Sequence, residues 1–528
     1  MERDVGFRTP VGSRLRALIL SSGLTGYLGL IAIVWFSLLL ASAWLVGSEG
    51  GIAWLWLVAM AVPTSALAVT LVDIMVLRRV GATLLPGLDL RAGVPSHLRT
   101  MVIVPVIMTD AAELARHIET LEIHYLSSGG GDLTFALLID GADADTQVLR
   151  TDAALLEQAD EGIAQLNRRY PSGPAGPRFL HLHRRRLLNP AEGVWMGWER
   201  KRGKLEELNR LLRGATDTSF VLKSAVVPND VRYVITLDAD TRMPRDVVAR
   251  MVGKMGHPLN RPSIEDGLVV AGYGILQPRV TPAIGPISTP YLRTTAGSGG
   301  MDPYASAASD VFQDLFGQGS FTGKGIYDVD AVQAAMHGRI APNTVLSHDL
   351  LEGIFARAGL ASDIELVEAF PERHDLAASR QHRWTRGDWQ LAGRIMDRAT
   401  PMLGRIKIAD TLRRSLLAPA TLVALSLGWF MSPAQAAVAT ALLLTTIAVP
   451  VLLPAVLGMA PSGPAPDRRS HLRQVRRDGL FALRRVALDL AFLPDTAWRT
   501  GDAIWRANWR LHVSRRLLLE WTTAARNQ

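Results

Sequence analysis

Apolar residues are concentrated in four blocks near the two ends of the chain, and a pattern typical of a globular domain lies between them. Residues 24–46 contain no charged side chain, and residues 52–77 are interrupted only by Pro63 and Asp73. Each run is long enough to cross a hydrocarbon core of about 30 Å at about 1.5 Å per residue. Because only residues 47–51 separate the two runs, they predict a transmembrane helical hairpin.

A second pair of apolar runs follows the globular part. Residues 416–431 and 436–459 are apolar, and a short polar stretch, residues 432–435, joins them. The chain therefore divides into four parts: an N-terminal transmembrane hairpin in 1–80, a globular domain in 81–413, a second transmembrane hairpin in 414–460, and a tail in 461–528.

Basic residues flank the outer ends of both predicted hairpins, whereas the first turn carries only Glu49. These residues are Arg8, Arg14, Arg16, Arg78, Arg79, Arg413, Arg414, Arg468, Arg469, Arg473, Arg476 and Arg477. Lys and Arg accumulate on the cytoplasmic side of membrane proteins. We therefore expect a multi-pass membrane protein with its globular domain in the cytoplasm. The first apolar run is too long for a cleaved signal peptide.

The tail has a different pattern, in which apolar and arginine residues alternate. Trp498, Trp505, Trp509 and Trp521 recur through it. Basic amphipathic helices with tryptophan are typical of the membrane interface, where arginines meet lipid headgroups. The alternative is an ordinary amphipathic helix that packs on the globular domain.

The globular domain alternates short β-branched runs with helical patterns. The predicted strands are 101–107, 134–140, 178–183, 232–238 and 268–276, and the predicted helices between them are 111–125, 204–212 and 245–255. This alternation predicts an α/β fold with a mostly parallel sheet, in which ligands bind at the carboxyl ends of the strands.

Composition narrows the possible chemistry. The 528-residue chain has no cysteine, which excludes disulfides, thiolate nucleophiles and cysteine-ligated zinc. Its formal net charge of +8 would suit a nucleic-acid-binding protein. The basic residues gather beside the apolar blocks and in the tail, however, so we assign them to membrane topology and to the lipid bilayer as a partner. No nucleic-acid partner is expected.

Carboxylates at two predicted strand ends are candidate ligand-binding groups. Asp140 ends one strand, and Asp238 and Asp240 end another. Alternate residues of an extended chain face the same way, so Asp238 and Asp240 can approach one cation together. No glycine-rich phosphate loop follows either strand, since residues 129–131 precede a strand and suit a flexible loop. A Mg²⁺ or Mn²⁺ ion held by Asp238 and Asp240 is therefore the expected means of neutralising a diphosphate. A simple strand-end turn is the alternative.

Two further segments carry candidate catalytic groups. His348 and Asp349 stand at the entry to an apolar helix, where Asp349 is placed to take a proton from a hydroxyl or, alternatively, Ser347 or Asp349 caps the helix. Just upstream, residues 321–327 contain two glycines and a lysine, which suits close approach by a sugar or phosphate.

Residues 380–389 place three arginines and two tryptophans, Trp384 and Trp389, in a short run. Indole faces bind sugar rings, and guanidinium groups bind diphosphate oxygens in a bidentate manner.

Taken together, these residues resemble the processive family-2-type glycosyltransferases with a GT-A fold, such as the cellulose, chitin and hyaluronan synthases. They are most similar to the glycosyltransferase segment of bacterial cyclic β-1,2-glucan synthases. The resemblance spans roughly residues 95–400 and is carried by the runs 199–209, 237–244, 272–280, 317–330, 347–349 and 380–390.

The resemblance implies a role for each candidate residue. Asp140, Lys204, Asn209, Asp238 and Arg383 would bind the donor UDP-glucose; Asp238 and Asp240 would hold the metal; Asp349 would be the catalytic base; and Trp384, with His348 and Trp389, would lie on the side of the glucan acceptor. The sequence departs from the family's Gln-x-x-Arg-Trp motif at its first position, which is Arg380. The role of Arg380 is therefore open.

The resemblance also implies an inverting transfer of glucose to a growing β-1,2-glucan. Cyclic-glucan synthases of this kind are several times longer and carry further domains for chain length and cyclisation. The chain is thus either a fragment or a short form that works with further synthase domains or subunits. Another processive synthase, of the osmoregulated-glucan, cellulose or chitin type, and a catalytically silent membrane scaffold remain alternatives. A transporter is disfavoured, because Asp73 is nearly the only charge within the predicted spans.

Overall fold

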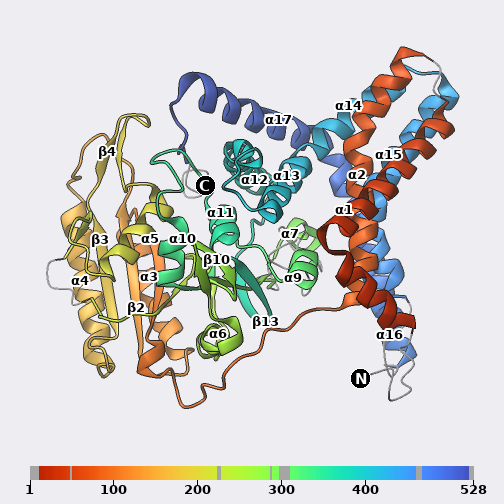
Figure 1. Ribbon diagram of the computed structural model, residues 1–528. Coiled ribbons are helices and arrows are strands. Elements are labelled where there is room, and N and C mark those ends of the chain that lie inside the picture. Colours follow the sequence, from red (N-terminus) through yellow and green to blue (C-terminus); the bar gives the residue numbers. More distant parts are fainter. Residues whose placement is uncertain are drawn as a thin grey trace, which may run out of the picture.

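A helical bundle and an α/β domain lie side by side in the computed structural model (Figure 1). The structure describes residues 11–47, 50–222, 227–285, 288–295, 310–459 and 467–521. Arg8, Glu49 and the end of the tail, which entered the sequence argument, lie outside these ranges.

The bundle contains helices α1 (Val11–Val46), α2 (Gly51–Val80), α14 (Leu417–Trp429) and α15 (Pro433–Leu457). Within the described ranges, three helices are long and apolar enough to cross a membrane: the part of α1 from Ile19 to Val46, α2, and α15. Helix α14 has 13 residues, which corresponds to about 20 Å. The expected span at 416–431 is therefore shorter than a full crossing, because α13 (Met402–Ser415) ends directly before it and Ser432 opens α15 directly after it.

The four helices pack through small and large residues that fit together. Trp56 and Met60 of α2 are buried against Ala424 of α14 and Ala439 of α15. Large apolar side chains cover the outside of the bundle, including Phe36, Leu40, Trp44 and Val58. An interior that is already packed leaves this outer apolar surface for lipid.

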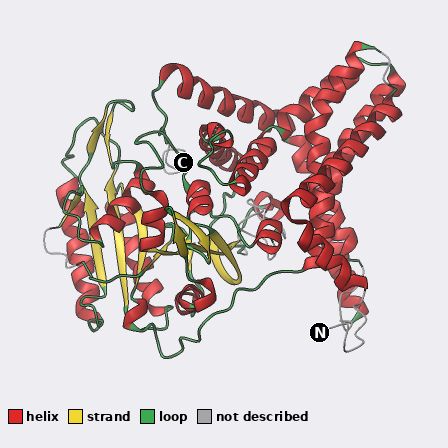
Figure 2. Cartoon of the chain, viewed as in Figure 1, coloured by secondary structure: helices red, strands yellow, loops and turns green. Residues whose placement is uncertain are grey.

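The α/β domain is built on a nine-stranded sheet with the order β6-β3-β2-β1-β7-β12-β11-β13-β8 (Figures 1 and 2). Its strands are β1 (Thr100–Met108), β2 (Leu133–Gly141), β3 (Phe179–Arg184), β6 (Phe220–Val221), β7 (Tyr233–Thr236), β8 (Thr241–Arg242), β11 (Ile275–Pro282), β12 (Gly325–Asp328) and β13 (Ala358–Glu368). Strands β3, β2, β1 and β7 run parallel, and so do β11 and β13, whereas β6, β12 and β8 are antiparallel to their neighbours. The predicted mixed α/β fold with a mostly parallel sheet is confirmed.

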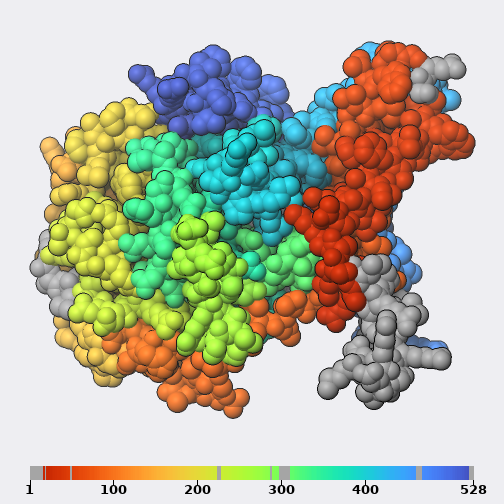
Figure 3. All heavy atoms as spheres, in the orientation of Figure 1, coloured from red at the N-terminus to blue at the C-terminus, as the bar shows by residue number. Residues whose placement is uncertain are grey.

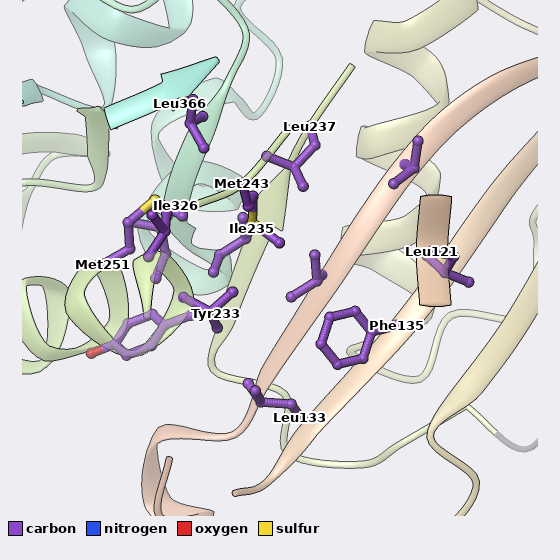
Figure 4. Packing of buried hydrophobic residues seen from close by; sticks show 14 of the residues in the cluster. Leu121, Leu133, Phe135, Tyr233, Ile235, Leu237, Met243, Met251, Ile326 and Leu366 are labelled. Atoms are coloured by element: carbon purple, nitrogen blue, oxygen red, sulfur yellow. The ribbon is translucent and has the colours of Figure 1, made fainter. Parts of the chain in front are cut away.

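Helices cover the sheet, as a parallel sheet requires. They include α3 (Ala111–Leu126), α4 (Asp152–Arg169), α5 (Arg200–Leu211), α6 (Val247–Gly256) and α10 (Val329–Met336). Every residue of β2 is buried. Figure 4 shows Phe135 of β2, Tyr233 and Ile235 of β7 and Leu121 of α3 in the main apolar core.

One predicted strand, 268–276, is divided in the structure. Residues Leu268–Ala271 form β10, which pairs with β9 (Ser263–Glu265) outside the main sheet, and β11 begins only at Ile275. The break falls at Gly272, where a Cβ atom would overlap the carbonyl of Arg261. Periodicity alone could not place this break, because the run is apolar on both sides of it.

The tail forms two helices, α16 (Arg468–Ala491) and α17 (Leu493–Trp509). Figure 3 shows α17 in dark blue as a ridge on top of the α/β domain, beside the bundle. Ala497 and Ala503 lie on the buried face of α17, which packs on α12 (His374–Gln390). The opposite face exposes Trp498 and Trp505, which are 77% and 66% exposed. One face of α17 therefore packs on the α/β domain, and the placement of the opposite face at a membrane interface stays a prediction.

Candidate active site

Asp238 lies just beyond the carboxyl end of β7, where the chain leaves the centre of the sheet. Its carboxylate accepts hydrogen bonds from Lys201 Nζ at 2.6 Å, and its other oxygen lies 3.0 Å from Lys324 Nζ. Burial alone would raise the pKa of Asp238, but the two ammonium groups lower it well below the usual value. Asp238 is therefore an anionic centre held between two lysines.

Asp240 and Glu368 complete a group of three carboxylates with Asp238. One oxygen from each lies within 4.8 Å of the others. Partial loss of hydration, together with the charges of Glu368 and Asp238, raises the pKa of Asp240 to about 6. Hard divalent ions such as Mg²⁺ and Mn²⁺ prefer oxygen donors of this kind. The three carboxylates fit such an ion, and Glu368 adds a candidate ligand to the predicted pair.

Asp349 is the first residue of α11 (Asp349–Phe355), and the preceding His348 is buried. The N-cap position of α11 is His348 and not Ser347 or Asp349, and the His348 side chain makes no capping hydrogen bond. His348 Nδ1 lies 3.0 Å from Glu352 and 3.4 Å from Asp349. Burial by itself would lower the pKa of His348, but these two carboxylates raise it.

Gly323 connects the Asp349 region to Asp238. A Cβ atom on Gly323, whose φ is +84°, would lie 2.9 Å from both carboxylate oxygens of Asp349. The Gly323 carbonyl accepts a hydrogen bond from Lys201 Nζ at 2.8 Å, and the same ammonium group contacts Asp238. Asp349 and Asp238, which are predicted as base and metal ligand, therefore line one site. Burial raises the pKa of Asp349, which favours a group that can accept a proton.

Helix α12 brings the predicted arginine and tryptophan residues to this site. Arg380 contacts Glu368 at 2.9 Å and stacks over the ring of Trp384 at 4.7 Å. Burial and the neighbouring Arg380 lower the pKa of Arg383 to about 10, while Asp238 opposes that shift. Arg383 also lies 4.7 Å from the ring centre of Trp521, a residue of the tail. Arg380, the departure from the family motif, thus holds Glu368.

Four predicted residues make their described hydrogen bonds with groups other than the three carboxylates. Both carboxylate oxygens of Asp140 accept hydrogen bonds from Arg184 at 2.8 Å, and Lys204 Nζ lies 3.1 Å from one of these oxygens. Lys204 also donates to the carbonyls of Val106 and Leu138.

Asn209 and Trp389 are also held inside the domain. Asn209 accepts a hydrogen bond from the buried Tyr327 hydroxyl at 2.9 Å. Trp389 donates to Ser415 Oγ at 2.9 Å and packs against a separate apolar cluster of the α/β domain that includes Leu391 and Ile408. In this arrangement Asp140, Lys204, Asn209 and Trp389 stabilise the domain around the site, and a direct role in ligand binding remains a prediction.

The sequence argument missed Lys201, Lys324, Glu368 and Trp521 as site residues. Lys201 precedes Lys204 by one helical turn of α5, and the spacing alone gave no reason to prefer either lysine as the residue that binds the donor. Lys324 belongs to the glycine-rich run that was expected to approach a phosphate. Glu368 and Trp521 carried no local sequence signal. Glu368 lies near Asp238 and Trp521 lies near Arg383, and each pair is separated by more than 100 residues in sequence.

We predict that Lys201→Met and Lys204→Met affect different properties: the first weakens donor binding, and the second lowers the stability of the fold. Lys201→Met should raise the KM for the donor about tenfold or more and leave the thermal midpoint unchanged. Lys204→Met removes one partner of a buried ion-pair network, which should cost about 3 kcal/mol of stability and change the KM little. Thermal unfolding and donor titration of both variants test this. A KM increase in Lys204→Met as large as that in Lys201→Met, without a loss of stability, would show that Lys204 also binds the donor.

The fold and the site define an α/β enzyme domain with carboxylates and cations gathered at the strand ends, attached to a bundle with candidate membrane spans. Over 451 residues, or 84% of the chain, it is 47% identical to the "Cyclic beta-(1,2)-glucan synthase NdvB" of Rhizobium meliloti (strain 1021). The chain is thus homologous to a segment of a cyclic β-glucan synthase, and the predicted resemblance is confirmed at that level. It spans 16% of that relative's length.

Two further comparisons complete the picture. No family model matches the chain. The structure is similar to that of a mannosyltransferase, PcManGT from Pyrobaculum calidifontis in complex with GDP-Man and Mn²⁺, with 16% sequence identity and a TM-score of 0.41. That similarity covers 88% of this chain and 100% of the mannosyltransferase chain.

Proposed function

We propose that this chain is the glycosyltransferase part of a glucan synthase and transfers glucose from UDP-glucose to a growing β-1,2-glucan with inversion. The homology to a cyclic β-glucan synthase supports a glucosyltransferase. The observation that carries the proposal is the shared contact of Lys201 with Asp238 and with the Gly323 carbonyl beside Asp349. It brings a group that can accept a proton next to a set of charges suited to a leaving diphosphate.

The chemistry assigned to each residue follows from its surroundings. Asp349 takes the proton of the acceptor hydroxyl as that oxygen attacks the anomeric carbon and the bond to the diphosphate breaks. Lys201 and Arg383 neutralise the diphosphate, where negative charge grows in the transition state. A divalent ion on Asp238, Asp240 and Glu368 would supply further positive charge at the same oxygens. Trp384 offers an aromatic surface to the acceptor sugar.

The test is turnover by the purified chain in detergent with radiolabelled UDP-glucose and Mg²⁺ or Mn²⁺. Labelled polymer with β-1,2 linkages that disappears on chelation supports the donor, the product and the metal together. UDP release only when a short β-glucan is added would still support transfer and would assign initiation to further domains or subunits. Label from another UDP-sugar, or another linkage, would replace the proposed substrate with that of a different polysaccharide synthase. Tight UDP-glucose binding without any transfer would support the silent scaffold instead.

The membrane arrangement follows from the bundle and from α17. We propose that α1 and α2 form one hairpin in the bacterial inner membrane and that α15 forms a second hairpin with the shorter α14, so that the α/β domain and the tail both lie in the cytoplasm. The exposed tryptophan face of α17 then lies in the cytoplasmic interface. Arg499 and Arg506 flank this face and can reach lipid headgroups.

Single-cysteine labelling can test the position of α17, because the chain contains no native cysteine. We expect a polarity-sensitive fluorophore on Trp505→Cys, in lipid nanodiscs, to be quenched by nitroxides near the headgroups. The matched control is Gln165→Cys on α4, at the edge of the α/β domain far from the bundle (Figure 1), which should not be quenched. Equal quenching at the two positions would contradict the interfacial placement.

A further inference from the structure

Lysine is rare in this protein and is used mainly in its interior. The sequence has only six lysines, and arginine supplies the rest of its 57 basic residues. Three of the described lysines, Lys204, Lys254 and Lys407, are buried and donate to backbone carbonyls. The other two, Lys201 and Lys324, both reach Asp238. Two of the few ammonium groups are therefore placed on one candidate metal ligand.

Lys324 lies where it can replace a metal ion between two of the three carboxylates. Its Nζ is 3.0 Å from Asp238 and 2.8 Å from Glu368, and the side chain is 6% exposed. Its position is fixed by the next residue, because Gly325 opens β12 and pairs with Thr236 at the end of β7. An ammonium group is a compact point charge with three donors, whereas a guanidinium is a planar fork. Lysine is thus the side chain that best imitates a bound cation here.

The charges near the site favour joint binding of a cation and a diphosphate. Four carboxylates, Asp238, Asp240, Glu368 and Asp349, are balanced by four cationic side chains, Lys201, Lys324, Arg380 and Arg383. A divalent ion alone would add positive charge to this balanced group and would also have to displace an ammonium group from Asp238. A diphosphate brings the compensating negative charge and offers the displaced ammonium groups new partners.

We propose that Lys324 is a positioning residue that competes with the divalent ion for Asp238 and Glu368, so that the ion binds firmly only together with the nucleotide diphosphate. The inference rests on the proposed function for the identity of the donor and the ion. It adds an order to their binding: the diphosphate draws the ammonium groups of Lys201 and Lys324 away from Asp238, and the ion takes the freed carboxylate oxygens. By linkage, the ion and the nucleotide must strengthen each other's binding by the same factor.

The experiment measures Mn²⁺ binding to the full chain by electron paramagnetic resonance, with and without UDP. We expect weak Mn²⁺ binding to the wild type without UDP and binding at least about tenfold tighter with it. Lys324→Met should bind Mn²⁺ about tenfold more tightly than the wild type in the absence of UDP, and UDP should strengthen that binding less. A merely structural lysine could not produce this gain in affinity. Arg168→Met, at an exposed position of α4, removes the same charge away from the site and should match the wild type.

Two results would overturn the proposal. One is equal Mn²⁺ affinity of the wild type and Lys324→Met without UDP; the other is no Mn²⁺ binding by either protein with UDP present. If Lys324→Met fails to fold, Lys324→Gln provides the same comparison with a polar side chain. Either failure is distinguishable from failure of the proposed function, because glucose transfer is measured separately and can proceed with any order of binding.

Discussion

Asp349→Asn is expected to reduce glucose transfer by about a thousandfold while UDP binding stays within about threefold of the wild type. Asparagine keeps the shape of the side chain but cannot accept the proton of the acceptor hydroxyl, and general bases typically contribute about 10²–10⁴ in rate. Asp349 lies at the start of α11 beside Gly323, and the carbonyl of that glycine accepts a hydrogen bond from Lys201, one of the cations proposed to bind the diphosphate. Calorimetric titration with UDP, alongside turnover, separates the two effects.

The control for Asp349→Asn is Asp89→Asn, because Asp89 is exposed and pairs only with the exposed Arg91 among the described contacts. That variant should keep full turnover. A loss of UDP affinity as large as the loss of rate in Asp349→Asn would mean that Asp349 binds the nucleotide, and would contradict its assignment as the base. Full activity of Asp349→Asn would move the search to His348 and Glu352, whose side chains lie within 3.0 Å of each other.

The sequence was sufficient for those parts of the fold that repeat a simple physical pattern. Strands β1 and β2 are buried along most or all of their length and therefore read as nearly continuous apolar runs. Asp238 could be predicted as a site residue because a buried strand delivers it to the edge of the sheet. The positions of α1, α2 and α15 likewise follow from apolar composition, although α1 begins at Val11, well before the predicted apolar run.

Contacts between distant segments could not be predicted in this way. Glu368 joins Asp238 only because β13 and β7 lie in the same sheet on either side of β12 and β11. Trp521 meets Arg383 because the chain after α17 folds back, with the carbonyl of Leu518 accepting from Gln390 of α12 at 3.0 Å. No local periodicity encodes either meeting, so both depend on the whole topology.

The two lysines of α5 show a further limit to what the sequence can predict about a site. Lys201 and Lys204 are separated by three residues and would share one face of an ideal helix. In the structure Lys204 is 2% exposed and points to the carbonyls at the ends of β1 and β2, while Lys201, at the first turn, reaches Asp238. The structure therefore adds Lys201 as a second candidate within the motif that the resemblance identifies, and which of the two lysines binds the donor stays a prediction.

The second large effect is expected at Asp238. Asp238→Asn should abolish metal-dependent transfer, with a loss of about a thousandfold, because a positioned cation contributes on the order of 4 kcal/mol at a developing diphosphate charge. Unlike Asp349→Asn, this variant should also lose the gain in UDP affinity that Mn²⁺ gives the wild type. Mn²⁺ binding in the presence of UDP and turnover over a range of Mg²⁺ concentrations measure the two losses.

Asp240→Asn and Asp363→Asn complete this test. Asp240→Asn should weaken Mn²⁺ binding and turnover together, since Asp240 belongs to the same three carboxylates. Asp363→Asn removes a carboxylate that pairs with Arg250 and Lys254 away from these carboxylates, and should leave both measurements unchanged. If chelation leaves wild-type turnover unchanged while Asp238→Asn still loses it, Asp238 acts by anchoring Lys201 and Lys324 alone. In that case the cations that neutralise the diphosphate belong to the protein itself.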